Sequence, residues 1–116
     1  MNIDRIDMGG VTVLRLEGDL DDGEGVGALR IALLDCIRER RYRVVVDLSG
    51  SGYISYMGIG VLVERLRLLR QHGGDMKLSG INLYTERVFR LSGVSSVLCT
   101  CATEAVAIQG LREAAA

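Results

Sequence analysis

Apolar and polar positions alternate at the start of the chain, which is typical of β-strands. In "VTVLRLEG", residues 11–18, apolar side chains recur along a segment that ends in glycine, so we expect a strand there. "MNIDRIDM", residues 1–8, has a similar pattern and is joined to it by Gly9-Gly10. Because two glycines suit the primed turns that connect antiparallel strands, the first 18 residues are predicted to form a β-hairpin.

The remainder of the chain alternates between helical and strand-like patterns. Apolar residues recur every three or four positions, as on the buried face of a helix, in four segments: 26–40, 59–71, 84–93 and 103–115. Short apolar runs between them predict three further strands at 42–50, 75–81 and 96–101. The first of these strands, "YRVVVDLSG", is continuously apolar, which is typical of a central strand covered on both faces.

Polar residues and glycines mark the helix ends. Asp21 or Asp22 is predicted to cap the first helix, where a carboxylate accepts free backbone N–H groups. Thr85 and Thr103 are the corresponding candidates for the last two helices. Gly93 and the "HGG" after the second helix provide the left-handed conformations that close helices. These signals support separate, short elements joined by short loops.

Strands that alternate with helices predict an α/β fold. We expect a mostly parallel mixed sheet of four to five strands, covered by about four helices. The chain has 116 residues, which suits one domain over residues 1–116 with its own hydrophobic core.

Charge and hydropathy narrow the functional classes. The chain has 14 basic and 15 acidic residues, for a net charge of −1, which argues against non-specific binding to nucleic acid or to an anionic membrane. It has neither a signal-peptide pattern nor an apolar run near the ~18 residues that span a bilayer. We therefore expect a cytoplasmic protein without direct membrane insertion.

The residues that could support metal or catalytic chemistry are few. Cys36, Cys99 and Cys101 have no zinc-knuckle spacing and are accompanied by only one histidine, His72. We expect reduced, mostly buried thiols, with a redox pair at the last two as a minor alternative. An acidic cluster could bind a hard cation together with Asp47, but capping and solvated-turn roles explain the same residues, which are Asp19, Asp21, Asp22 and Glu24. We predict no metal, no cofactor and no enzymatic activity.

Three segments in order resemble one known family, the STAS domain of bacterial anti-sigma factor antagonists and of sulfate-transporter tails. "LEGDLD" at 16–21 is similar to the family's Gly-Glu-Leu-Asp segment. "VVVDLSGSGYISYMGIGVLVERL" at 44–66 is similar to its central strand, serine-containing turn and helix. "GGDMKLSGINLYTERVFRLSGV" at 73–94 resembles the following strand and helix. The resemblance covers nearly the whole chain.

The resemblance implies a protein-binding regulatory module. In this family the partner is often a serine kinase that is also an anti-sigma factor, and it phosphorylates a serine at the start of the central helix. A phosphate adds about −1.5 to −2 charges there, which backbone N–H groups can hold while the charge repels an acidic partner surface.

The turn "SYMG", residues 55–58, departs from the family pattern. Alignment on Gly58 and Gly60 puts Tyr56 at the phosphoacceptor position and Met57 at the small residue after it. A phenolic oxygen projects several ångströms further than a serine hydroxyl, so Tyr56 is expected to be a poor substrate for a serine kinase. Ser55 is a substitute acceptor, with Ser51 less favoured.

We therefore expect the chain to bind a kinase-type anti-sigma factor without the usual serine switch. The expected contact surface comprises the turn, the outer face of the helix after it and the acidic loop before the first helix: Ser55, Tyr56, Met57, Gly58, Glu64, Arg65, Arg67, Asp19, Asp21 and Asp22. Packing of Tyr56 and Met57 on the domain itself is an equally simple account of both residues.

Two alternatives remain at this point. The first is a structural or homo-oligomerising subunit of a multiprotein complex, such as a stress-signalling scaffold or lipid-transport machinery. The second is binding of a nucleotide or small anion at the start of the central helix.

Overall fold

The computed structural model describes residues 1–115 and begins with the expected hairpin. Strands β1 (Asn2–Met8) and β2 (Val11–Glu17) pair antiparallel, with Met8 opposite Val11. Gly9 adopts a φ of 64° between them, a conformation that glycine reaches without the strain of a side chain. The predicted two-residue glycine turn is therefore confirmed.

A five-stranded sheet in the order β1-β2-β3-β4-β5 forms the centre of the fold. Its first pair is antiparallel and the other pairs are parallel, so the predicted mostly parallel mixed sheet is confirmed. The elements that follow β2 are α1 (Glu24–Arg38), β3 (Arg43–Gly50), α2 (Tyr56–Gln71), β4 (Asp75–Ser79), α3 (Leu83–Leu91), β5 (Thr100–Cys101) and α4 (Glu104–Ala115).

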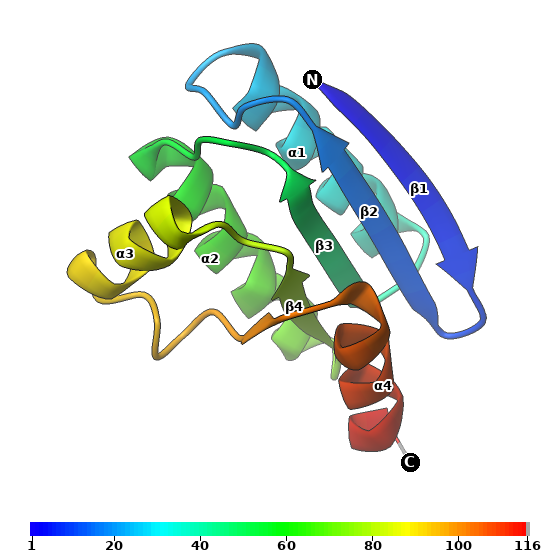
Figure 1. The fold of residues 1–116 in the computed structure, drawn as a ribbon. Coiled ribbons are helices and arrows are strands. Elements are labelled where there is room, and N and C mark those ends of the chain that lie inside the picture. The colour runs from blue at the N-terminus through cyan, green and yellow to red at the C-terminus, as the bar shows by residue number, and fades with distance from the viewer. Residues whose placement is uncertain (116) are drawn as a thin grey trace.

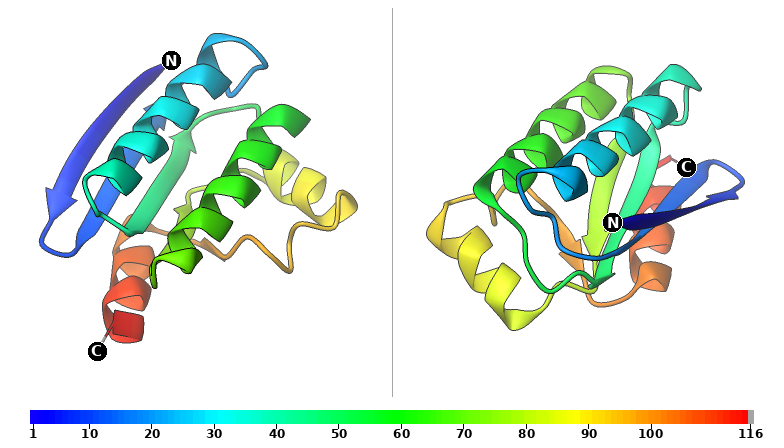
Figure 2. Two further views of the ribbon diagram at one scale, coloured as in Figure 1. Left: turned by 180° about the vertical axis from the view of Figure 1, so that it is seen from behind. Right: turned by 90° about the horizontal axis from the view of Figure 1, so that it is seen from above.

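Helices cover both faces of this sheet (Figures 1 and 2). Helices α1 and α2 lie side by side on one face, where alternate strand residues such as Leu14, Val44 and Val46 are fully buried. Helix α4 covers the other face, where Val13 and Val45 pack with Leu111. The period of two along each strand sends neighbouring side chains to opposite faces, which explains why β3 is apolar throughout.

Several element ends differ from the sequence-based expectations. Helix α2 begins at Tyr56 rather than at residue 59, because Ser55 caps it. Asn82, not Thr85, caps α3; its side chain accepts the Thr85 backbone N–H at 2.7 Å. The expected strand over 96–101 shrinks to Thr100–Cys101, because residues 95–97 form a turn.

Other end signals are confirmed. The Thr103 hydroxyl accepts the Val106 backbone N–H at 3.2 Å at the start of α4. Gly73 and Gly93 follow α2 and α3 with φ values of 79° and 77°. The expected cap of α1 is wrong: the N-cap residue is Gly23 rather than Asp21 or Asp22, although the Asp21 carboxylate accepts the Gly25 N–H at 3.1 Å.

The parallel strands determine where functional groups can meet. The carboxyl ends of β2, β3 and β4 point to the same edge of the sheet, and each continues into the loop before a helix (Figure 1). In open α/β sheets this edge is where binding sites form.

Candidate functional site

The turn between β3 and α2 is held by Ser55, which is only 5% exposed. Its side-chain oxygen accepts the backbone N–H of Gly58 at 3.1 Å, and its carbonyl accepts that of Ile59 at 3.0 Å. This is the geometry of an N-cap, which satisfies donors that the helix itself leaves free. The Ser55 hydroxyl is thus a structural group of the turn.

Tyr56 and Met57 form the exposed first turn of α2. Tyr56 is 78% exposed and Met57 is 50% exposed, so the alternative in which both residues fill space against the domain does not hold. Large apolar side chains at this level of exposure are the kind that protein interfaces use at their centres.

Three of the four tyrosines of the chain gather at this edge. The rings of Tyr53 and Tyr84 stack with their centroids 6.5 Å apart. Together with Tyr56 they line a cavity of about 60 Å³, whose remaining walls are Ile54 and Val88. We call Tyr53, Tyr56 and Tyr84 the tyrosine patch; it joins the start of α2 to the start of α3.

The acidic loop before α1 lies beside the turn, as the sequence predicts. Leu20 donates its backbone N–H to the Tyr53 carbonyl at 2.9 Å and accepts the Ser55 N–H at 2.8 Å. This backbone bridge places the flanking Asp19, Asp21 and Asp22 next to the capped turn, and all three are exposed. Gly25 allows the loop to close, because a Cβ there would lie 2.2 Å from the Asp19 carbonyl oxygen.

Two buried polar residues hydrogen-bond the loops at the same edge of the sheet. Asp47, at the end of the buried part of β3, accepts the hydroxyls of Ser49 at 2.8 Å and Ser79 at 3.0 Å. Ser51 is buried and donates to the Gly18 carbonyl at 2.7 Å. Both residues therefore stabilise the loops rather than face a ligand.

Arg65 was expected on the outer face of α2, and this expectation is wrong. The residue is only 8% exposed, since it follows Val61 and Leu62 at helical spacing within the buried stripe. Its Nη1 donates to Glu64 Oε1 at 2.7 Å, and its buried Nε has no hydrogen-bond partner within residues 1–115. Arg65 is thus largely buried, and the aliphatic part of its side chain packs with apolar neighbours.

Glu64 and Arg67 occupy the exposed face of α2, as expected. Arg67 also lines a groove of about 450 Å³ that runs between α2 and Val97. The structure therefore brings the predicted turn and acidic loop together, whereas the helix contributes two exposed charged residues rather than three.

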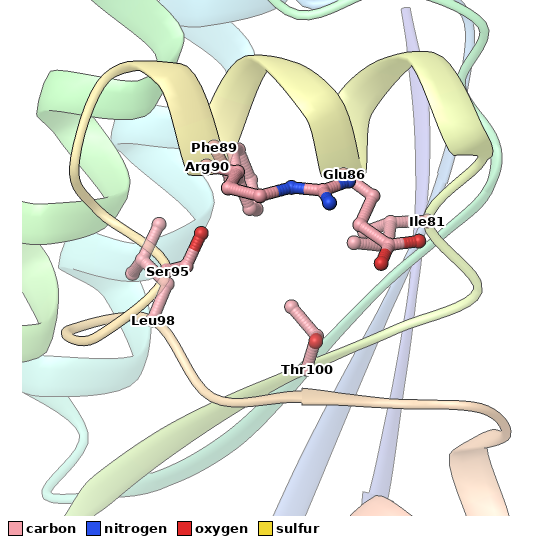
Figure 3. Close-up of a pocket in the computed structure, with 7 residues that line it drawn as sticks. All are labelled: Ile81, Glu86, Phe89, Arg90, Ser95, Leu98 and Thr100. Carbon is pink, nitrogen blue, oxygen red and sulfur yellow. The ribbon is translucent and has the colours of Figure 1, made fainter.

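A second pocket, of about 250 Å³, lies between α3 and the chain entering β5 (Figure 3). Its floor is apolar, from Phe89 and Leu98, and Figure 3 shows Arg90 extended below α3 towards Glu86. Sequence reasoning missed this pocket. The only available signal was the opposite charge of Glu86 and Arg90 four residues apart on one helix.

The thiols differ from the expectation of mostly buried cysteines. Cys36 is buried, but Cys99 is exposed and Cys101 is half-buried. The difference arises because the expected strand over 96–101 is largely irregular at the outer edge of the sheet, which leaves Cys99 uncovered. His72 is the C-terminal cap residue of α2, as expected, and stacks on Tyr42 with 4.6 Å between ring centroids.

Within residues 1–115, no group of three or more His, Cys, Asp or Glu side chains is arranged to hold a metal ion. None of the helices over these residues is both long and apolar enough to cross a membrane.

Comparison with known protein families matches residues 2–107 to the STAS domain. The chain belongs to this family. The STAS match covers the hairpin, the capped turn, the tyrosine patch and part of α4, so the site described above lies wholly within it.

The proteins similar to this chain include anti-sigma factor antagonists. The anti-sigma F factor antagonist of Paenibacillus polymyxa is 28% identical over 90 residues, which cover 77% of this chain and 76% of the relative. A putative anti-sigma factor antagonist from Thermotoga maritima has a similar structure, with a TM-score of 0.87 at 21% identity over 95% of this chain and 94% of its own. The Bacillus cell fate determinant SpoIIAA, solved in its phosphorylated form, gives a TM-score of 0.73 at 23% identity over 96% of this chain and 100% of its own.

Proposed function

We propose that this STAS domain regulates by binding a protein, as an antagonist of a kinase-type anti-sigma factor. We further propose that phosphorylation of a serine in the turn does not control this binding. The observation that carries the proposal is the first turn of α2, where an exposed Tyr56 follows a Ser55 hydroxyl that is buried and already in use as the cap.

A phosphate on Ser55 would disturb the turn. The Ser55 oxygen accepts the Gly58 N–H inside a site that is only 5% exposed. A kinase needs an acceptor hydroxyl that it can place in line with the γ-phosphate of ATP. For a kinase to reach the Ser55 hydroxyl, the start of α2 would have to open. The helix would also lose its cap, which costs about 1 kcal/mol.

Tyr56 offers an exposed hydroxyl, but at a different distance from the backbone. Its ring lies between the acceptor oxygen and the helix, so the oxygen is displaced by several ångströms from the place that a serine kinase attacks. A rigid, amphipathic tyrosine ring is instead well suited to the centre of a protein interface.

Charge around the tyrosine patch supports a partner with a basic rim. The acidic loop contributes Asp19, Asp21 and Asp22 to one side, joined to the turn through the Leu20 backbone. Exposed charges of this kind chiefly affect the rate of association and the choice of partner. The apolar tyrosine patch and Met57 would supply most of the affinity.

The proposal is tested by titrating the protein against the kinase-type anti-sigma factors of its own genome, with calorimetry as the readout. Tyr56→Ala is expected to weaken binding at least about tenfold, the effect of a hot-spot residue. Ile31→Ala is the matched control, because Ile31 is 62% exposed but lies on α1 away from the turn. Equal affinities for the two variants would refute the proposed surface.

The switch is tested separately by mass spectrometry after incubation with partner and ATP. We expect unmodified protein and unchanged binding. Stoichiometric phosphate on Ser55 or Tyr56 would restore the switch and overturn the second half of the proposal, while leaving the binding surface intact.

A homo-oligomer is the second candidate, favoured by the outer face of α3. Leu83 and Leu91 are both largely exposed there, next to Tyr84. Light scattering distinguishes the two candidates: an oligomer that dissociates on Tyr84→Ala supports self-association, and a monomer at all concentrations excludes it.

A further inference from the structure

Two thiols and an ammonium group lie at the β5 edge of the sheet. Lys77 extends from β4, and its Nζ donates to the Sγ of Cys99 at 3.3 Å. Cys101 follows two residues further on and is half-buried. A cation thus contacts one thiol, and a second thiol lies two residues along the chain.

The position of Lys77 depends on a glycine in α4. A Cβ at Gly110 would lie 2.9 Å from Lys77 Cε and 3.4 Å from its Cδ. The absent side chain leaves room for the lysine stem between α4 and Cys99. The ammonium is therefore held beside the sulfur by packing, rather than by the flexible reach of a free surface lysine.

The three cysteines of the chain have different environments. Cys36 is fully buried in the main core, and burial raises the pKa of its thiol. Burial also raises the pKa of the half-buried Cys101 thiol. Cys99 is exposed and is the cysteine that the Lys77 ammonium contacts. Reactive thiols are accessible and lie beside a positive charge, whereas buried thiols are inert.

We propose that Cys99 is a redox-reactive thiol that hydroperoxides oxidise, with Lys77 as its positioning cation and Cys101 as the resolving thiol. In the first step, the Cys99 thiolate attacks one peroxide oxygen; an S–O bond forms, the O–O bond breaks, and the departing oxyanion takes a proton from water. In the second step, Cys101 attacks the sulfenic sulfur; an S–S bond forms, and hydroxide leaves with the Cys101 proton as water. The two thiols lose two electrons, and the hydroperoxide gains them.

The outer strand can accommodate this product. β5 has only two residues, Thr100 and Cys101, and pairs only with β4. Residues two apart in a strand are separated by about 6.6 Å, near the upper limit for Cα atoms joined by a disulfide. Ring closure therefore draws Cys99 and Cys101 together and weakens the bonds that they make to β4, from Leu78 N–H to the Cys99 carbonyl and from Gly80 N–H to the Cys101 carbonyl.

Trypsin separates the relevant cysteines, which makes the test direct. Cleavage after Arg90 and Arg112 releases residues 91–112 with Cys99 and Cys101, while Cys36 lies in residues 31–38. After treatment with hydrogen peroxide, we expect the 91–112 peptide of the folded protein to lose two hydrogens and the Cys36 peptide to stay unmodified. Equal oxidation of both peptides would overturn the proposal.

Single substitutions assign the roles of the two thiols. Cys101→Ser is expected to leave a sulfenic acid on Cys99 that dimedone traps, with no disulfide. Cys99→Ser is expected to abolish oxidation at Cys101. Unchanged oxidation of Cys101 in that variant would show that Cys99 does not initiate the reaction, and would refute the assignment.

The role of Lys77 is measured through the rate of Cys99 alkylation by iodoacetamide at pH 7. Because opposite charges about 4 Å apart attract by about 1 kcal/mol even in water, Lys77→Met should slow alkylation about fivefold. Lys77→Arg should largely preserve the rate, and Gly110→Ala, which displaces the lysine stem, should change it in the direction of Lys77→Met. A rate unaffected by Lys77→Met would overturn the role of the cation.

Discussion

Arg65 provides a quantitative test of the packing of α2. The change is Arg65→Met, which keeps an unbranched side chain of similar length and removes the guanidinium. Arg65 is 8% exposed and its buried Nε has no partner within residues 1–115. A buried donor without a partner costs about 1–3 kcal/mol, whereas an ion pair to a carboxylate that is mostly in solvent contributes only about 0–1 kcal/mol.

The comparison of these two free energies predicts that methionine at position 65 stabilises the fold. Glu64, the ion-pair partner at 2.7 Å, has a side chain that is 55% exposed, so it returns to water without cost when Arg65 is replaced. We expect the free energy of unfolding to rise by about 1 kcal/mol, because the cost of the unpaired buried Nε exceeds the contribution of the half-exposed ion pair. For a domain of this size that corresponds to a midpoint temperature about 4 °C higher.

Urea unfolding followed by circular dichroism measures this difference. The dependence of the unfolding free energy on urea should be unchanged, because the surface exposed on unfolding is nearly the same. Glu64→Gln is the matched control and should change stability by less than about 0.5 kcal/mol. A loss of more than about 1 kcal/mol in Arg65→Met would show that the guanidinium is satisfied, and would refute the reasoning.

Two further predictions concern the cap and the acid stability. Ser55→Ala should lower the free energy of unfolding by about 1 kcal/mol, since the Gly58 N–H loses its acceptor, whereas Ser55→Asp should retain most of it; thermal unfolding measures both. Hydrogen bonds from the Arg5 guanidinium hold the pKa values of Glu39 and Asp7 below their usual range. These carboxylates therefore stabilise the fold at neutral pH, and this contribution is lost as the pH falls below about 4 through their folded-state pKa values. Glu39→Gln should show a shallower loss of midpoint temperature between pH 5 and 2.

Each of these two predictions would be contradicted by a specific result. A free energy of unfolding unchanged by Ser55→Ala would mean that the cap bond contributes little to the fold. Parallel pH curves for Glu39→Gln and the unchanged protein would mean that the Arg5 contact does not persist in solution.

The alternation of apolar residues was sufficient to predict the order of elements, because each pattern reflects a buried face. Val44, Val45 and Val46 are fully buried, as a continuous run implies. The end of the sheet was less predictable: residues 96–101 are rich in β-formers, yet the Leu98 backbone N–H bonds the Val94 carbonyl in a turn. Such local hydrogen bonds compete with strand pairing, and they cannot be predicted from the spacing of apolar residues in the sequence.

The candidate site was predictable in position but not in detail. The turn and the acidic loop each follow one of two neighbouring parallel strands, β3 and β2. They therefore lie at the same edge of the sheet, which the topology predicts. The burial of Arg65 was not predicted, because its charge favours the exposed face although it follows Val61 and Leu62 at helical spacing. The tyrosine patch joins one loop residue, Tyr53, to the first turns of two helices, and the contact between Tyr53 and Tyr84 is tertiary.

The backbone bridge at Leu20 has a consequence for how this surface can diversify. Its hydrogen bonds join main-chain atoms of two loops, so they do not depend on which side chains the loops carry. Exposed positions such as Tyr56 and Met57 can therefore be exchanged while the frame beneath them keeps its shape. Binding specificity and the stability of the fold can therefore change independently. A family with such a backbone frame can bind new partners while its fold stays the same.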